Sequence, residues 1–250
     1  MKDIIVKELK EFEKQNNAKV LLAVEAGSRT WGFDSKDSDY DVRFIYVKNK
    51  NHYLQLNEQK DTIELIHTDE LDIVGWDLKK FLKLMKKSNP SVYEFLQVSS
   101  IYIEDKSFYK IREVAPHYFF WKDLAWHYYS MSYKHDRRYI LNTTPTKKRY
   151  LYAFRGVFAA YWVINYKDVP PTDFEVIKNK FCPLDLIPTV DGLVVDKKCG
   201  LASEECDRIE SLDKFLEQSY KNLNDILSYN NERKPSYSWE ELNNIFLEFL

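Results

Sequence analysis

Apolar positions in the first 105 residues predict a small sheet with flanking helices. Residues 4–12 carry apolar side chains at helical spacing, whereas residues 20–26 and 42–47 form apolar runs of strand length. Two more strand-like runs, at residues 63–67 and 71–76, are joined by an acidic turn. An amphipathic helix with apolar residues on one face is predicted directly after the last of these strands.

From residue 107 onward the spacing of apolar residues is largely helical. Residues 118–141 and 147–166 have apolar side chains three and four positions apart, and residues 203–229 follow the same pattern. Residues 183–200 carry few helix signals and are predicted to be an irregular connector, with a small hairpin at Asp191 and Gly192 as an option. The prediction is an α+β fold: a domain with a small mixed sheet and flanking helices over residues 1–105, then a mostly helical domain over residues 106–250.

The segment between the first two predicted strands carries the clearest chemical signal. It begins with Gly27 and Ser28 and ends with Asp39 and Asp41 at the start of the second strand. Side chains alternate along a strand, so the two carboxylates point the same way. Such a pair is tolerated if it shares a proton, stays solvated or holds a divalent cation such as Mg²⁺. Glycine allows a ligand to approach the backbone, and Ser28 with the following amides offers donors to phosphate. The pattern therefore points to a nucleoside triphosphate with its metal.

These residues also resemble a known family. The Gly-Ser…Asp-x-Asp signature of the DNA polymerase β-like nucleotidyltransferases is matched by Gly27, Ser28, Arg29, Gly32, Ser38, Asp39 and Asp41. Residues 27–47, 72–93 and, more loosely, 147–162 are similar to one branch, the YcgL-like predicted nucleotidyltransferases linked to RNA repair. The spacing between two strand-like runs favours this interpretation over an acidic β-turn.

The resemblance implies a site with two Mg²⁺ ions, for which Mn²⁺ is a substitute. Asp39 and Asp41 would bind the metals, and a third acidic residue on a neighbouring strand would complete the site. Asp72 matches the family pattern best, while Glu64 and Asp77 stay open as alternatives. Asp77 also has the position of a helix N-cap.

For the triphosphate, the resemblance implies that Ser28 and the amides after Gly27 hold the β- and γ-phosphates. Arg29 and Arg43 are further candidates, and Arg43 lies on the same strand face as the aspartates, where its charge would offset their repulsion.

The implied reaction is transfer of a nucleoside monophosphate to an acceptor hydroxyl with release of pyrophosphate. An RNA 3′ end, such as that of a tRNA-like molecule, is the expected acceptor, and a protein hydroxyl is the alternative. A third possibility is an inactive module that binds nucleotide or RNA. ATP is the default triphosphate, because the sequence does not select a base.

Basic residues in the helical half offer a second set of candidates. Lys148 lies in a cluster near the connection between two predicted helices, where it would contact a triphosphate or an RNA backbone, or simply solvent. Arg155 has apolar neighbours in sequence, so we expect it to need an anionic partner, either a substrate phosphate or a structural carboxylate.

Composition sets the remaining limits. The net charge of −2 and 30% charged residues are ordinary for a soluble protein and include no polybasic tail. Three cysteines, Cys182, Cys199 and Cys206, lack zinc-type spacing and leave an odd thiol, which favours a reducing cytoplasm. No run approaches the length of a membrane span.

Overall fold

The computed structural model describes residues 1–35, 38–68 and 70–250. Contacts between residues divide the chain into two compact units. The sheet unit comprises Met1–Thr30, Asp39–Phe119 and Pro235–Leu250, and the helical unit comprises Trp31–Ser38 and Phe120–Lys234. The predicted boundary at residue 105, with catalytic and binding roles for the two parts, stays a prediction.

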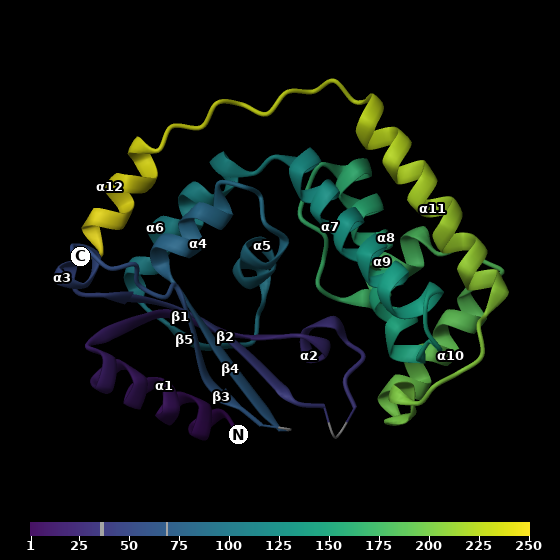
Figure 1. Cartoon of the computed structure of the whole chain (residues 1–250), viewed down its shortest axis with the longest axis horizontal. Helices are drawn as coiled ribbons and strands as arrows, with labels where there is room; N and C mark the ends of the chain where they lie inside the picture. Colours follow the sequence, from purple (N-terminus) through teal and green to yellow (C-terminus); the bar gives the residue numbers. More distant parts are fainter. Residues whose placement is uncertain (36–37, 69) are drawn as a thin grey trace. The chain divides into compact units, whose positions relative to one another are not determined.

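The sheet unit is built on a five-stranded mixed sheet in the order β3-β4-β2-β1-β5 (Figure 1). The strands are β1 (Ala18–Ala26), β2 (Tyr40–Lys48), β3 (Thr62–His67), β4 (Leu71–Asp77) and β5 (Ile101–Glu104). The β2–β4 pair is parallel, and the other three pairs are antiparallel. The α+β class is confirmed, and β5 is a strand that the pattern did not predict.

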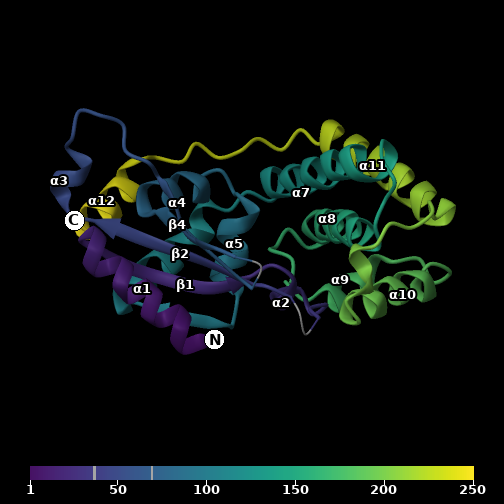
Figure 2. The same cartoon turned by 60° about the horizontal axis from the view of Figure 1, so that its bottom comes forward.

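The two faces of this sheet carry different helices (Figure 2). Helix α1 (Lys2–Asn16) covers one face with Ile5, Leu9 and Phe12, which pack into the cluster that contains Val42 and Phe44. On the opposite face Trp76 of β4 lies 5.4 Å, between ring centroids, from Phe95 of α5 (Pro90–Gln97). Alternation along β2 and β4 places Asp41 and Asp72 on this second face.

Short helices complete the sheet unit. They are α3 (Lys50–Tyr53), α4 (Leu78–Met85), α6 (Tyr109–Val114) and α12 (Glu240–Glu248). Helix α12 is attached through Phe246, whose ring centroid lies 5.0 Å from that of Tyr53. Helix α2 (Ser28–Trp31) follows β1 directly.

The helical unit is arranged around α8 (Lys147–Tyr166), whose side chains are buried along most of its length. The other helices are α7 (Trp121–Asp136), a π-helical turn (Arg137–Leu141), α9 (Phe174–Phe181), α10 (Ile187–Lys198) and α11 (Glu210–Tyr229). Gly156 allows α7 and α8 to approach closely, because a Cβ there would lie 2.6 Å from Ser132 Cβ.

Helix α10 contradicts the prediction of an irregular connector. Its buried residues Val190, Leu193 and Val194 have helical spacing. Pro188 lies in the first turn, where a missing amide hydrogen costs nothing. Burial of one helix face therefore outweighs the weak helix propensity of the segment. No helix in the described part of the chain is long and apolar enough to cross a membrane.

Candidate active site

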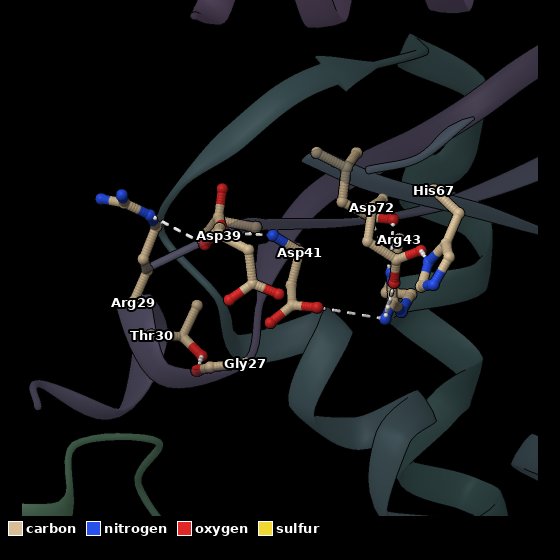
Figure 3. Close-up of polar contacts among 10 residues, drawn as sticks. Gly27, Arg29, Thr30, Asp39, Asp41, Arg43, His67 and Asp72 are labelled. Carbon is tan, nitrogen blue, oxygen red and sulfur yellow. Dashed lines mark hydrogen bonds and ion pairs between the residues drawn. The ribbon is translucent and has the colours of Figure 1, made fainter. Parts of the chain in front are cut away.

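Asp39 and Asp41 lie at the start of β2 and point the same way (Figure 3). Tyr40, between them, packs against the core on the α1 face. Figure 3 shows both carboxylates directed toward Gly27 and Thr30. The alternation predicted for these two aspartates is therefore present.

The turn that follows β1 is in direct contact with one of these carboxylates. Gly27 has a φ of 65°, and its carbonyl oxygen accepts a hydrogen bond of 2.8 Å from the Thr30 hydroxyl. A Cβ placed on Gly27 would lie 1.9 Å from Oδ2 of Asp41. Only glycine fits this position, for reasons of both conformation and space. Ser28, the next residue, is buried at the start of α2.

Asp72 lies directly beside Asp41 in the sheet. The parallel pairing of β2 and β4 matches Asp41 with Asp72 and Val42 with Ile73. Arg43 Nη2 lies 2.7 Å from Asp72 Oδ2 and 3.3 Å from Asp41 Oδ1, so one guanidinium contacts both carboxylates. His67 Nδ1 lies 3.1 Å from the other oxygen of Asp72.

The contacts of Asp72 favour the ionised form of its side chain. Burial by itself would raise the pKa of Asp72. The hydrogen bond with His67 and the positive charge of Arg43 outweigh burial, and the pKa lies below its usual value. Asp72 is therefore ionised at neutral pH.

The two alternatives to Asp72 lie elsewhere. Asp77 begins α4 as its N-cap: its carboxylate accepts from the Lys79 amide at 2.8 Å and from the Tyr53 hydroxyl at 2.7 Å. Burial raises the pKa of Asp77. Glu64 is exposed on β3, and β4 separates that strand from β2. Of the three candidates, Asp72 is the one paired with Asp41.

Arg29 contacts the backbone at the motif. Its Nε donates to the Asp39 carbonyl oxygen at 3.1 Å, and its guanidinium carbon lies 3.9 Å from the centroid of the Tyr40 ring. Arg29 therefore helps to fix the conformation of the chain at Asp39, and its predicted contact with phosphate stays a prediction.

The other two candidate residues, Lys148 and Arg155, belong to the helical unit. Arg155 is 6% exposed, and its guanidinium carbon lies 4.0 Å from the centroid of the Trp31 ring. Lys148 Nζ lies 5.6 Å from the centroid of the Tyr152 ring. Their roles toward a substrate, and the anionic partner expected for Arg155, stay predictions.

Known proteins match almost the whole length of the chain. The model of the RlaP family, described as the RNA repair pathway DNA polymerase beta family, matches residues 1–248. The chain belongs to the RlaP family. It is also 34% identical over 252 residues to the uncharacterized protein YcgL of Bacillus subtilis (strain 168). That alignment covers 99% of this chain and 95% of YcgL. The resemblance read from the sequence is confirmed, and RlaP membership indicates a polymerase β-like nucleotidyltransferase connected with RNA repair.

Nucleotidyltransferases of this type use a nucleoside triphosphate and a divalent metal, so the fit of this RlaP site to a cation matters. Asp39 and Asp41 supply adjacent carboxylates, the ligands that Mg²⁺ prefers. Among the described residues no three His, Cys, Asp or Glu side chains form a complete metal site. The pair Asp39–Asp41 fits a hard cation, whereas Asp72 is held by Arg43 and His67.

One residue that contacts the RlaP motif was not predicted. Glu25 of β1 is 3% exposed, and its carboxylate accepts from the Asp41 amide at 3.0 Å and from the Tyr102 hydroxyl. Burial raises the pKa of Glu25. The available signal was a charged residue inside the apolar run 20–26, since such a residue needs partners within the fold.

Proposed function

We propose that this protein transfers a nucleoside monophosphate from a nucleoside triphosphate to the 3′ hydroxyl of an RNA, with release of pyrophosphate. The observation that carries the proposal is the contact between Gly27 and Asp41. It joins the turn at Gly27 and Ser28, whose amides would bind phosphate, to the acidic pair in one site. ATP is the default donor. The RlaP family name supports RNA as the acceptor.

The chain's own residues have distinct tasks in this proposal. Gly27 leaves room for the Asp41 carboxylate, and Ser28 with the amides after Gly27 binds the β- and γ-phosphates. Arg29 keeps Asp39 oriented through the backbone. Arg43 offsets the repulsion between Asp41 and Asp72 in the free protein and turns to a substrate phosphate on binding, since a guanidinium binds phosphate as well as carboxylate.

Asp39 and Asp41 would hold the divalent cations, and Asp72 would join them once Arg43 has moved to phosphate. When bound, Mg²⁺ offsets the charge of the departing pyrophosphate and lowers the pKa of the attacking hydroxyl. The acceptor oxygen forms a bond to the α-phosphorus, the bond from that phosphorus to pyrophosphate breaks, and the hydroxyl proton passes to a carboxylate. In-line geometry and charge neutralisation supply most of the rate.

The test uses a double variant, Asp39→Asn with Asp41→Asn. The protein is incubated with each labelled triphosphate, Mg²⁺ or Mn²⁺, and either total RNA or cell lysate. We expect label on RNA from the wild type and none from the double variant, with the unfolding transition retained. A matched control is Asp185→Asn with Asp225→Asn, which removes two exposed carboxylates of the helical unit.

The outcomes separate the possible functions. Label on protein instead of RNA would make the protein a protein nucleotidyltransferase. Triphosphate binding without any transfer would make it a binding module. Transfer that survives in the double variant would refute the assigned site.

A further inference from the structure

A cavity of about 310 Å³ lies in the helical unit beside the end of α7 and the start of α8. Its wall includes His135, Tyr139, Lys148, Arg149 and Tyr152. None of the described residues that line it is an aspartate or a glutamate. The cavity is therefore positively charged and aromatic, which is the chemistry of sites for unpaired nucleotides.

The cations and the tyrosines of this region are in contact. The guanidinium carbons of Arg138 and Arg149 each lie 5.0 Å from the centroid of the Tyr139 ring. Lys148 Nζ is 5.6 Å from the Tyr152 ring centroid. We name these five residues, Arg138, Tyr139, Lys148, Arg149 and Tyr152, the tyrosine–cation surface.

The cations of this surface have no acidic partner in the described part of the chain. Among the described residues, no carboxylate forms an ion pair with Arg138, Lys148 or Arg149. The adjacent Lys147 is different, because its Nζ lies 2.6 Å from Asp196 Oδ2. Arg138 and Lys148 are therefore available to an external anion, while Arg149 adds positive charge beside them.

The backbone holds this surface in place before any ligand binds. The π-helical turn Arg137–Leu141 extends α7 and carries both Arg138 and Tyr139, and such turns are frequent at functional sites. The Arg149 guanidinium donates hydrogen bonds to the carbonyl oxygens of Tyr139 at 3.4 Å and Thr144 at 3.2 Å. These bonds hold the connection between the two helices. The surface therefore loses little conformational entropy when a ligand binds.

His135 adds a neutral aromatic ring to the wall. Its Nε2 lies 3.2 Å from the Arg149 carbonyl oxygen, and burial lowers its pKa. The imidazole is therefore uncharged at neutral pH, and its ring centroid lies 5.0 Å from that of Tyr139. The wall thus offers aromatic faces next to cations.

We propose that the tyrosine–cation surface binds single-stranded RNA, with an unpaired base stacked on Tyr139 and phosphates held by Arg138 and Lys148. This inference rests on the proposed function, for which it supplies the acceptor-binding surface. Unpaired bases are required because a duplex hides their faces from aromatic side chains. A nucleoside triphosphate brings one base and one group of phosphates, whereas this surface has two tyrosines and three cations, which suit a chain of several nucleotides.

The experiment measures binding alone, by fluorescence anisotropy of a labelled single-stranded RNA with the full-length protein. Tyr139→Leu removes the ring and is expected to weaken binding about fivefold or more, whereas Tyr139→Phe keeps the ring and the affinity. Lys148→Gln is expected to reduce the slope of log K against log salt by about 0.7. Lys221→Gln, an exposed charge of α11, is the matched control and should leave both quantities unchanged.

Three results would overturn the inference. They are unchanged affinity in both Tyr139→Leu and Lys148→Gln, equal loss in Lys221→Gln, or full displacement of the RNA by mononucleotide at similar concentration. Thermal unfolding of each variant verifies that the fold persists.

The same assay in the Asp39→Asn/Asp41→Asn protein separates this inference from the proposed function. We expect that protein to bind RNA like the wild type. If the wild type transfers no nucleotide but its RNA binding still depends on Tyr139, the transferase proposal fails and the binding surface stands.

Discussion

Asp41 of β2 and Asp72 of β4 lie side by side on neighbouring parallel strands, and Arg43 contacts both carboxylates. Neighbouring strands lie about 4.8 Å apart, so two ionised groups at this separation repel each other. The guanidinium offsets that repulsion in the free protein. We therefore expect the site to respond to added divalent cations.

Replacement of Arg43 by glutamine tests this relationship. Without a divalent ion we expect Arg43→Gln to lower the free energy of unfolding by about 1 kcal/mol, because the two carboxylates lose their shared partner. Added Mg²⁺ should then raise the melting temperature of the variant more than that of the wild type. Arg112→Gln, which removes a different arginine–carboxylate pair, is the control. Equal Mg²⁺ shifts in all three proteins would contradict the arrangement.

The identity of the third acidic residue leads to a second prediction. Asp72→Asn should abolish nucleotide transfer, since its neutral amide is a poor ligand for a hard cation. Asp77→Asn should keep the cap of α4 and retain activity, and Asp77→Ala should cost about 1 kcal/mol of stability with activity preserved. Glu64→Gln should change neither quantity. The measurements are the nucleotide-transfer rate and the denaturant unfolding of each variant. Loss of activity in Asp77→Asn alone would make Asp77, rather than Asp72, the third acidic residue.

Gly27 provides a third prediction. Gly27→Ala should lose nucleotide transfer, because the new Cβ displaces the Asp41 carboxylate, and should cost about 1–2 kcal/mol of stability from the left-handed backbone. Gly192→Ala is the matched control: it lies within α10, and a Cβ there meets no atom within 4 Å. We expect Gly192→Ala to be active and slightly more stable. Wild-type transfer in Gly27→Ala would argue against a single site formed by the turn and Asp41.

A buried aspartate in the helical unit gives a prediction about pH. Asp136 is 4% exposed, and burial raises its pKa from 3.8 to about 6, partly countered by the charges of Arg137 and Arg208. The negative charges of Asp213 and Glu217 raise the pKa of Asp136 further. Because the folded pKa exceeds the unfolded value, the native state loses stability as pH rises from about 4 to about 6.

The variant Asp136→Asn isolates this contribution. Above pH 6 we expect it to be more stable than the wild type by on the order of 2 kcal/mol, with the difference vanishing below pH 4. Urea unfolding of both proteins across this range measures the effect. A difference that does not depend on pH would show that Asp136 keeps its ordinary pKa in the fold.

Much of the sheet unit followed from local pattern. Four of its strands were predicted from runs of apolar residues, and the common direction of Asp39 and Asp41 followed from alternation along a strand. Helix α10 was missed because its helical state depends on packing of Val190 and Val194 rather than on propensity. Glu25 was missed because its partners, the Asp41 amide and Tyr102, come from other strands.

Sequence pattern alone was enough to place the glycine-serine turn beside an acidic pair and to indicate the family, since both depend on residues close together in the chain. The sequence favoured Asp72 over Glu64 and Asp77 through its match to the family pattern, and only the tertiary structure showed that strand order and register place Asp72 beside Asp41. It also showed that Arg43 joins Asp41 to Asp72 and that Gly27 touches Asp41. These contacts arise from packing between strands, which spacing along one strand does not specify.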